Sequence, residues 1–369
     1  MKLLIIARPF VFHGGVERAT AGLVAALVEH GYDVHLLSPR GQAPVPGVTL
    51  HTLRLPPLPP AARLLVLAAG AQRRVAGSGW DVVQSHERTL CQHVYRAGEG
   101  CHRAYLASEA RPQARGLYHR IVLALERRVF ARTPRIVAIA EAGRREIEAL
   151  YGVAASRLSV VYNGVDLERF HPRNRARERG RARSAAGIAS SAFTALFVGS
   201  GFARKGLATA IEGFAAFSDR QSRLVVLGKG DTREYRALAS RLGMGERVVW
   251  LGARDDPERW YAAADIVVLP SRYEPFGNVH LEALAAGLPV VASARAGGAE
   301  VIADGINGAI VNPTDSRAVA SALDRFRARP VADVTAAARR SAEPYTYAAQ
   351  VDGFAQIYGG LTRARCDFP

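Results

Sequence analysis

"DIVVLPSRYEPFGNVHLEALAAGLPVVAS", residues 265–293, is the stretch that decides the fold class of the chain. It holds two apolar runs, 265–270 and 288–293, separated by a turn at 275–278 and a helix pattern that starts at Val279. Both runs are continuous rather than alternating, which is typical of parallel strands covered on both faces. The stretch therefore predicts a strand–helix–strand unit of a parallel α/β sheet.

The same alternation of strand and helix patterns continues on both sides of this stretch. Further continuous apolar runs occur at 2–7, 33–37, 81–85, 135–140 and 158–162 in the first half, and at 193–199, 223–228 and 247–252 in the second. Helix patterns lie between them, such as 16–30, which Gly31 closes as a C-terminal cap. The chain is thus predicted to hold two Rossmann-like, doubly wound parallel-sheet domains.

The length of 369 residues suits two domains of ordinary size. We expect an N-terminal domain at 1–172 and a C-terminal domain at 191–346, with a final helix at about 347–362 that returns to the first domain. The segment 173–190 is rich in arginine and small residues and has no hydrophobic period. It predicts a linker, for which a solvated basic loop is an equally good description.

The composition is strongly basic, with 49 Lys and Arg against 33 Asp and Glu and a net charge of +16. Such a charge attracts phosphates on a nucleotide, a nucleic acid or an anionic bilayer, and composition does not choose among them. No apolar run is long enough to span a membrane, and the first residues do not form a signal peptide, so a cytoplasmic protein is expected. Cys91, Cys101 and Cys366 lack CxxC spacing and predict reduced structural thiols.

Ligands of open parallel sheets bind beyond the carboxyl ends of the strands, so the strand-to-helix loops of two facing sheets are expected to line a cleft. Gly14 and Gly15 follow the first strand and precede a helix. Glycines there let backbone amides approach an anion, although a plain turn needs the same residues. The pair is not GxGxxG, so the signature of a nicotinamide-dependent dehydrogenase is absent.

Arg204 and Lys205 follow the first strand of the second half, at the expected start of a helix. The helix dipole disfavours cations at an N-terminus, so an Arg-Lys pair there indicates a bound anion that offsets the conflict. Two exposed side chains on a loop are the alternative.

Glu274 and Glu282 lie on either side of the turn in the opening stretch. The amides of 276–279 can receive a phosphate, and Glu274 can accept hydrogen bonds from paired hydroxyls. Glu282, one helical turn further, is expected to point toward the same place. Two carboxylates would repel a diphosphate unless hydroxyl groups are their partners and Arg204 and Lys205 hold the phosphates, and a sugar joined to a nucleotide supplies both groups.

With these residues in place, the chain resembles the family-four retaining glycosyltransferases of the GT-B fold, and within them the lipopolysaccharide-core glucosyltransferases. The resemblance covers nearly the whole chain and is carried by "GSGFARKG" (199–206), "VYNGVDLERF" (161–170) and "YAAADIVVLPSRYEPFGNVHLEALAAGLPVVAS" (261–293). The two glutamates separated by seven residues, following the Arg-Lys pair, are its most specific feature.

The resemblance implies a role for each matching residue. Glu274 would bind hydroxyls of the donor sugar, Glu282 the ribose, and Arg204 with Lys205 would neutralise the departing diphosphate. The remaining donor contacts would come from loop residues, namely Gly14 and Gly15 over the phosphates, Gly252 and Arg254 at the base, and Phe276, Gly277, Asn278 and Val279 at the turn. Asp-x-Asp, the metal-binding signature of the other large transferase fold, does not occur, so neither a metal nor a cofactor is expected beside the nucleotide-sugar substrate.

The acceptor side is expected in 84–106, which offers His86, His93, Glu99 and His102. In the lipopolysaccharide branch an aspartate stands near the place of His93, which makes His93 the catalytic candidate, with a structural histidine as the alternative. Which of the four contacts the acceptor stays open. The retaining reaction of the family proceeds by front-face attack, so no protein nucleophile is required.

The segment 110–135 predicts a basic amphipathic helix at about 113–132. Leu117, Ile121, Leu125 and Val129 recur at helical spacing and would lean toward an anionic membrane surface, while arginines meet the headgroups. A packed helix with an arginine-rich solvated face fits the same pattern. The membrane interpretation places the protein peripherally on the inner face of the cytoplasmic membrane.

The sequence thus predicts a retaining, metal-independent hexosyltransferase that uses a nucleotide diphosphate sugar, UDP-glucose or a related UDP-sugar. The acceptor would be a glycolipid or glycan, such as lipopolysaccharide core or another cell-envelope glycan. A GT-B-like sugar-nucleotide epimerase uses the same donor and stays an alternative. A basic nucleic-acid-binding protein would explain the charge but not the two glutamates, and no nucleic acid is expected because no aromatic-rich basic strand is present.

Overall fold

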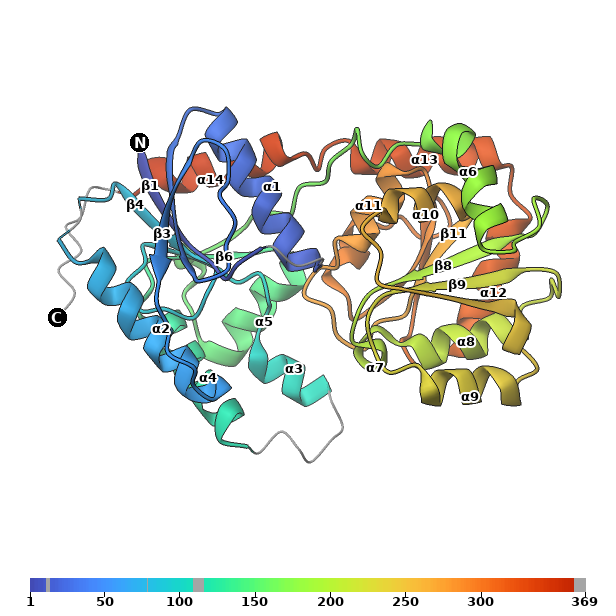
Figure 1. Ribbon diagram of the computed structural model, residues 1–369, viewed down its shortest axis with the longest axis horizontal. Coiled ribbons are helices and arrows are strands. Elements are labelled where there is room, and N and C mark those ends of the chain that lie inside the picture. The colour runs from blue at the N-terminus through green and yellow to red at the C-terminus, as the bar shows by residue number, and fades with distance from the viewer. Residues whose placement is uncertain (11–13, 78, 109–115, 362–369) are drawn as a thin grey trace. The chain divides into compact units, whose positions relative to one another are not determined.

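The computed structural model of the protein describes residues 1–10, 14–77, 79–108 and 116–361. The chain divides into two compact units, one formed by Met1–Gly164 with Tyr347–Pro369 and the other by Val165–Thr346 (Figure 1). The sequence predicts that the first domain ends at residue 172. In the structure its first segment ends at Gly164, and residues 165–172 belong to the second unit. Each unit is an α/β structure built on one parallel sheet.

The first unit contains a seven-stranded parallel sheet in the order β3-β2-β1-β4-β5-β6-β7. Its strands are β1 Lys2–Ile6, β2 Asp33–Pro39, β3 Val48–Leu53, β4 Val82–Ser85, β5 Val94–Arg96, β6 Arg135–Ala138 and β7 Leu158–Val160. Its helices are α1 Gly15–Glu29, α2 Pro60–Val75, α3 His102–Ser108, α4 Leu117–Arg132, α5 Glu141–Tyr151 and α14 Tyr347–Gly359.

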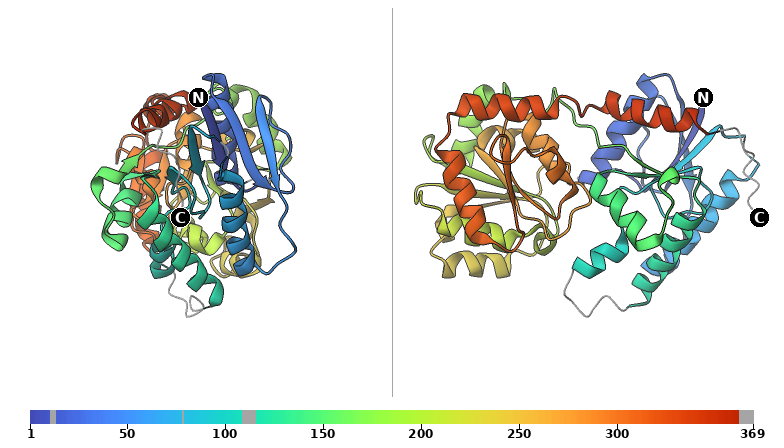
Figure 2. Two further views of the ribbon diagram at one scale, coloured as in Figure 1. Left: turned by 90° about the vertical axis from the view of Figure 1, so that its left-hand side faces the viewer. Right: turned by 180° about the vertical axis from the view of Figure 1, so that it is seen from behind.

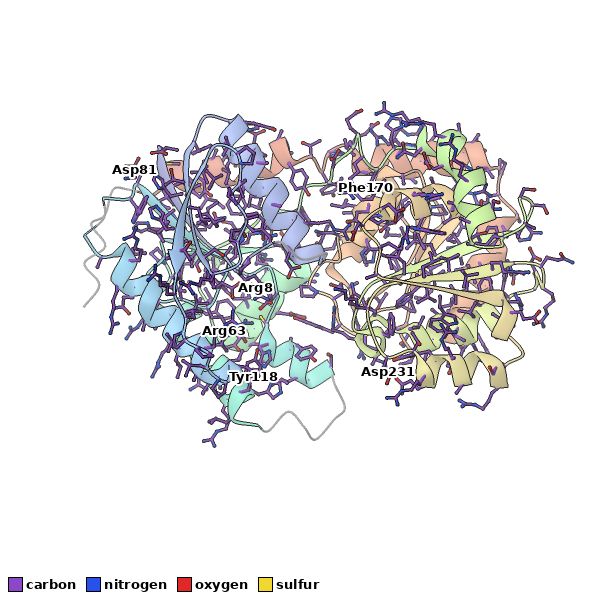
Figure 3. All side chains as sticks on the ribbon, in the orientation of Figure 1. Arg8, Arg63, Asp81, Tyr118, Phe170 and Asp231 are labelled. Carbon is purple, nitrogen blue, oxygen red and sulfur yellow. The ribbon has the colours of Figure 1, made fainter. Side chains whose placement is uncertain are left out.

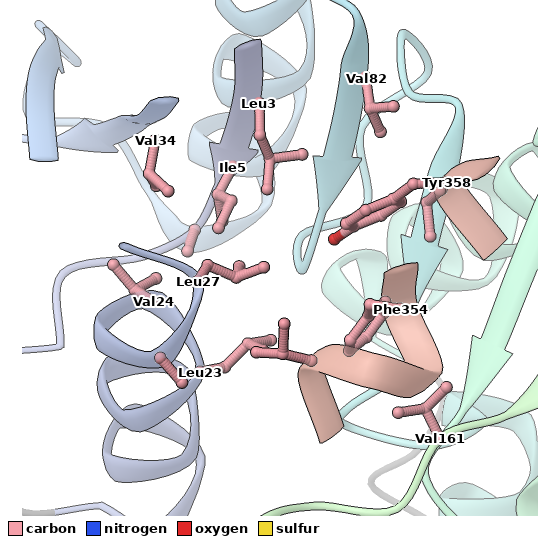
Figure 4. Close-up of a cluster of buried hydrophobic side chains, with 14 of the residues drawn as sticks. Leu3, Ile5, Leu23, Val24, Leu27, Val34, Val82, Val161, Phe354 and Tyr358 are labelled. Carbon is pink, nitrogen blue, oxygen red and sulfur yellow. The ribbon is translucent and has the colours of Figure 1, made fainter. Parts of the chain in front are cut away.

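Alternate side chains of β1 enter two different hydrophobic clusters, which shows that the sheet is covered on both faces. Leu3 and Ile5 pack in the cluster that contains residues of α1 and α14, while Leu4 and Ile6 pack in the cluster that contains residues of α2. Phe354 of α14 lies among the first set (Figure 4). The last helix of the chain therefore completes the core of the first unit, and it lies beside α1 (Figure 2).

The second unit contains a six-stranded parallel sheet in the order β10-β9-β8-β11-β12-β13. Its strands are β8 Thr194–Val198, β9 Arg223–Leu227, β10 Val248–Gly252, β11 Ile266–Leu269, β12 Val290–Ser293 and β13 Gly308–Val311. Its helices are α6 Asn174–Ala185, α7 Phe202–Lys205, α8 Leu207–Ala216, α9 Arg233–Arg241, α10 Pro257–Ala263, α11 Val279–Ala285, α12 Ser316–Arg327 and α13 Val331–Ala342. The opening stretch forms β11, α11 and β12, as the sequence predicts.

The segment 173–190 is not a linker, because most of it forms α6, which packs on α10 within the second unit. Arg175, Arg179 and Arg183 lie on one face of α6, four residues apart, and all three bind the carboxylate of Asp265 at 2.7–2.8 Å. They also donate to backbone carbonyls of 263 and 264. Arginine contacts replace the usual apolar stripe of a packed helix, so the segment shows no hydrophobic period.

Helix α4 is a packed element of the first unit rather than a helix with a free apolar stripe. Leu125 and Val129, expected to lean toward lipid, are buried, and Val129 belongs to a core cluster with Tyr95 and Phe130. Leu117, at the start of α4, is 66% exposed. Residues 113–115 of the expected helix lie outside the described residues. In the described part of the chain, no helix combines the length and apolar character needed to cross a membrane.

Candidate functional site

The Arg-Lys pair ends a short helix. Helix α7 follows β8, finishes at Lys205, and is closed by Gly206, which has φ +75°. A Cβ on Gly206 would lie 2.0 Å from the carbonyl oxygen of Pro270, so only glycine allows this close approach to the end of β11. The expectation that the pair begins a helix is therefore incomplete, since both cations also occupy the favourable C-terminal end of α7.

The counter-charge of this pair is Glu274, in the loop between β11 and α11. Its Oε2 is 2.9 Å from Nη1 of Arg204 and is ion-paired with Nζ of Lys205. The Glu274 carbonyl accepts from the amide of Gly297 at 2.9 Å, which fixes its backbone to the loop after β12. The loops after β8, β11 and β12 thus meet at Glu274, the first through its carboxylate and the last through its backbone.

Burial sets the electrostatics of this ion pair, because Glu274 is only 9% exposed and Lys205 only 7%. Burial alone would raise the pKa of Glu274, but the charges of Lys205 and Arg204 outweigh it and hold that pKa at about 2. Burial lowers the pKa of Lys205, which the charge of Glu274 opposes. A carboxylate held this firmly in its ionised form is an acceptor of hydrogen bonds and not an acid.

The turn after Glu274 depends on Gly277 and His280. Gly277 has φ +84°, and a Cβ there would meet both His280 and Glu274 below 3 Å. Nδ1 of His280 lies 2.7 Å from the Gly277 carbonyl, an acceptor, so Nδ1 carries the ring proton. Nε2 of His280 has no partner among the residues that the structure describes. Burial lowers the pKa of His280 to about 4, so the ring is neutral at ordinary pH.

Glu282 lies in α11 and is also buried. Its Oε2 accepts a hydrogen bond of 2.7 Å from the hydroxyl of Tyr261 in α10. Burial lowers the pKa of Lys205, and the charge of Glu282 opposes this change together with the larger effect of Glu274. The structure therefore brings Arg204, Lys205, Glu274 and Glu282 together, as the sequence predicts.

The other residues that the sequence predicts to contact a donor lie on loops or at a helix start. Gly252 ends β10 with φ +69°, and the exposed Arg254 after it is paired with Asp256 at 2.9 Å. Gly14 and Gly15 form the start of α1, with residues 11–13 before them outside the described part. Phe276, Gly277, Asn278 and Val279 form the turn that leads into α11.

In the first unit, charged residues gather at the carboxyl ends of β1, β4 and β5. Arg8, labelled in Figure 3, lies 2.7 Å from carboxylate oxygens of both Glu87 and Glu99. Arg88 continues the network to Glu99 at 2.9 Å and to the fully buried Glu126 at 3.0 Å. These pairs make a rigid, polar end to the sheet.

His86 immediately follows β4 and belongs to a chain of hydrogen bonds. The Tyr358 hydroxyl donates to the amide oxygen of Gln84, and the Gln84 amide nitrogen lies 2.9 Å from Nε2 of His86. Nε2 is then an acceptor, so Nδ1 carries the proton toward the Thr20 hydroxyl at 3.3 Å. Burial, and then the charges of Arg96 and Arg8, lower the pKa of His86 well below its ordinary value. His86 is a neutral, fixed ring.

His93, the catalytic candidate from the sequence, is not at this end of the sheet. It precedes β5, so it lies at the amino end of that strand, and its Nδ1 accepts the amide of Val83 at 3.0 Å. His102 begins α3, and its Nε2 lies 2.9 Å from Nδ1 of His119. Of the four acceptor-side candidates, His86 and Glu99 lie at the carboxyl ends of strands.

The residues missed from the sequence are Arg8, Glu87 and Arg96. Each lies at, or within two residues of, the carboxyl end of a strand, which is the end of the sheet where the loops that carry Arg204 and Glu274 lie in the second unit. The same rule applied to the first sheet points to Arg8 and Glu87, which follow recognisable strand patterns, but not to Arg96, because the three residues of β5 give no such pattern.

The described residues contain neither a metal-binding cluster nor a disulfide. Within the described ranges, no group of three or more His, Cys, Asp or Glu is arranged to hold a metal ion. Cys91 and Cys101 are free and buried, and Cys366 lies outside the described residues.

Comparisons with known proteins follow the same division of the chain. Residues 13–169 match the family model described as Glycosyltransferase Family 4, and residues 192–328 the model described as Glycosyl transferases group 1. A D-inositol 3-phosphate glycosyltransferase of Xylanimonas cellulosilytica is 33% identical over 300 residues, which cover 76% of this chain and 68% of the relative.

Solved structures agree on the fold. WaaG, a glycosyltransferase involved in lipopolysaccharide biosynthesis, superposes with a TM-score of 0.84 at 24% identity, covering 97% of this chain and 100% of WaaG. Anabaena HepE in complex with UDP and glucose superposes with a TM-score of 0.77 at 21% identity, covering 98% of this chain and 100% of HepE. Two parallel-sheet Rossmann-like units of this kind define a GT-B protein. The chain belongs to the family-four glycosyltransferases.

The neutral His280 predicts a specific pH dependence of stability. Its folded pKa of about 4 lies below the ordinary 6.5 of an unfolded histidine, so the unfolded chain binds the proton first as pH falls. Stability of the second unit should therefore decrease as pH falls from 6.5 to 4, by about 3 kcal/mol at most. His280→Gln should remove most of this slope.

Urea unfolding over a pH series, followed by tryptophan fluorescence, measures the effect. A Trp80→Phe background leaves Trp250 and Trp260, both in the second unit, as reporters. His30→Gln, an exposed histidine of the first unit, is the control and should keep the wild-type slope. Equal slopes for wild type and His280→Gln between pH 6.5 and 4 would contradict the assignment.

Proposed function

We propose that the protein is a retaining hexosyltransferase that takes its sugar from a UDP-sugar, UDP-glucose or a close relative, without a metal ion. The observation that carries the proposal is the convergence of Arg204, Lys205 and Glu274 at the strand ends of the second unit. Two cations beside an ionised carboxylate offer what a nucleotide diphosphate sugar needs, namely charge for the diphosphate and an acceptor for sugar hydroxyls. The complex of HepE with UDP and glucose supports the choice of donor.

Each donor-side residue has a role in this proposal. Arg204 and Lys205 stabilise the negative charge that grows on the diphosphate as its bond to the anomeric carbon breaks. Glu274 orients the sugar hydroxyls and Glu282 binds the ribose. The turn and loop residues complete the site, with Phe276, Gly277, Asn278 and Val279 offering amides to phosphate, Gly14 and Gly15 closing over it, and Gly252 and Arg254 meeting the base.

The reaction balances without a protein nucleophile. The acceptor oxygen forms its bond on the face from which the diphosphate leaves, so the anomeric configuration is retained. The acceptor proton passes to the departing phosphate oxygen. The protein supplies position and charge, and Arg204 and Lys205 take the part that a metal plays in other transferases.

We assign the acceptor to the first unit, at the ends of β1, β4 and β5, where His86 and Glu99 replace His93 as candidates. WaaG is involved in lipopolysaccharide biosynthesis, which supports a glycolipid or cell-envelope glycan as acceptor. The relative that acts on D-inositol 3-phosphate supports a second candidate, a small phosphorylated polyol. Product analysis without acceptor separates transfer from the epimerase alternative, which needs none.

We further propose that the start of α4 binds an anionic membrane surface, as a glycolipid acceptor requires, on the inner face of the cytoplasmic membrane. Leu117 and Tyr118 are 66% and 41% exposed, and Tyr118 is labelled in Figure 3. Arg120, Arg127 and Arg128 on the same helix are exposed. The contact surface is therefore this end of α4 with its arginines, and not the buried side chains of Leu125 and Val129.

Lys205→Ala tests the donor site. Turnover with a UDP-sugar should fall by roughly two to three orders of magnitude, because one group that stabilises developing charge is lost. Lys229→Ala, an exposed lysine of the same unit, is the control and should keep turnover. Excess EDTA in the assay should leave the wild-type rate unchanged. Turnover of Lys205→Ala within twofold of wild type would exclude the proposed role, and a rate lost to EDTA and restored by Mg²⁺ would exclude the metal-free mechanism.

Glu274→Gln and Glu282→Gln should behave differently. Glu274→Gln frees Lys205 and Arg204 from their counter-charge, so UDP should bind as well as to wild type or more tightly, while sugar transfer falls. Glu282→Gln should weaken UDP by about 1.5 to 3 kcal/mol through lost ribose contacts. Titration calorimetry with UDP decides, and equal losses for both variants would show that the roles are misassigned.

Membrane binding is tested by co-sedimentation with anionic vesicles. Wild type should bind and be released by salt, because the Debye length falls from about 10 Å at 0.1 M to about 3 Å at 1 M. Replacing Arg120, Arg127 and Arg128 with Gln should weaken binding on the order of a hundredfold, at about 1 kcal/mol for each charge. Replacing the exposed Arg233, Arg236 and Arg241 of α9 is the charge-matched control. If both triple variants sediment alike, α4 is a packed element only.

A further inference from the structure

The side chain of Arg96 is a buried cation with unused hydrogen-bond donors. It ends β5, is 1% exposed, and donates one hydrogen bond of 2.6 Å from Nη2 to Oδ1 of Asn163. Its Nε and Nη1 have no hydrogen-bond partner anywhere in residues 1–10, 14–77, 79–108 and 116–361. A buried guanidinium with unpaired N–H groups costs free energy. We therefore expect a ligand atom that accepts hydrogen bonds to bind beside it.

The carboxylates of the same pocket are engaged elsewhere. Glu87 is paired with Arg8, and Glu99 is paired with both Arg8 and Arg88. Glu17 also lines the pocket, and its charge acts on Arg8. Burial lowers the pKa of Arg96 to about 10, and no carboxylate of the pocket opposes this change. Arg96 is thus left without a counter-charge beside carboxylates that serve other arginines.

The pocket gives access to the free edge of Arg96. Arg96, Gly98, His86 and Thr20 line a cavity of about 10 Å³, which has room for one oxygen-sized group. Gly98 keeps this edge open, since a Cβ at that position would lie 2.4 Å from Nη1 of Arg96. His86 is neutral and does not compete as a second cation.

We propose that this pocket is an anion subsite for the acceptor, in which one oxygen of a carboxylate or phosphate group accepts hydrogen bonds from Nη1 and Nε of Arg96. The proposal rests on the proposed function, because it specifies the acceptor as a molecule that carries a negative charge. A neutral hydroxyl would fill the space but leave the buried charge unpaired. Arg96, at the carboxyl ends of β4 and β5, then determines which acceptor molecules bind. Arg204 and Lys205 serve the donor instead.

Arginine side-chain NMR on the whole chain tests the subsite without any transfer reaction. The Nε–H signal of Arg96 is assigned by its loss in Arg96→Gln. Titration with inorganic phosphate, and separately with sodium acetate, should shift this signal in wild type, and chloride at equal ionic strength should not. A shift with phosphate alone indicates a phosphorylated acceptor, and a shift with acetate alone indicates an acidic sugar or other carboxylate.

Gly98→Ala is the decisive variant because it narrows the pocket while keeping Arg96. Gly98 does not have a left-handed backbone, so alanine suits the backbone there, and its Cβ, 2.4 Å from Nη1, would press on the guanidinium of Arg96 and block its free edge. The apparent affinity for the anion should fall about tenfold or more. Gly180→Ala, where an added Cβ meets nothing within 4 Å, is the control and should leave the affinity unchanged.

The outcomes separate the two proposals. If neither anion moves the Arg96 signal, or if Gly98→Ala binds the anion as wild type does, water alone fills the pocket and the subsite is refuted. If the anion binds as expected but no sugar transfer is found with any UDP-sugar, the proposed function fails and the anion site stands.

Discussion

The buried ion pair between Glu274 and the cations Lys205 and Arg204 is the interaction on which the second unit's site depends. It joins the loop after β8 to the loop after β11, and the Glu274 backbone joins both to the loop after β12. Removing such charges from water costs several kcal/mol, and apolar residues of similar size often stabilise a fold as well or better. Ligand binding therefore explains a buried ion pair at this place better than fold stability does. A ligand with charges of its own can replace one partner of the ion pair by binding to the other.

The first unit uses the same construction with a different charge balance. Its strand ends carry Arg8, Arg88, Glu87 and Glu99 in one connected network, and Glu126 anchors this network from inside α4. Helix α4 is consequently tied to the strand ends by charge as well as by its apolar face. If α4 binds a membrane, Glu126 and its neighbours stay in place. The lipid contact is then restricted to the exposed start and the arginine side of the helix.

Structural features that depend on a local sequence pattern can be predicted from the sequence. Features that depend on contacts between residues far apart in the chain cannot. Most strands of both sheets follow from continuous apolar runs, but β3 is an alternating, half-exposed edge strand, β5 has three residues and β13 is a short edge strand that begins with glycine, so none of these three gives that signal. Glu274 and Lys205 can be predicted because they lie in loops between strong strand and helix patterns. Because β5 has no such pattern, the sequence alone does not place His93 at the amino end of that strand. Helix α6 was missed because its partner, Asp265, lies far away in sequence.

Arginine's part in the fold changes what the net charge of +16 means. Arg175, Arg179 and Arg183 hold α6 to Asp265 and to carbonyls at the C-terminal end of α10, and Arg157 donates to the carbonyls of Phe130 and Thr133. These guanidinium groups replace apolar contacts and helix caps, and their charge is used within the protein. An excess of arginine is therefore a poor guide to anionic ligands in this chain. The informative arginines are Arg96, which has two unpaired donors and ends β5, and Arg204, which shares the buried Glu274 with Lys205 in the loops that follow β8 and β11.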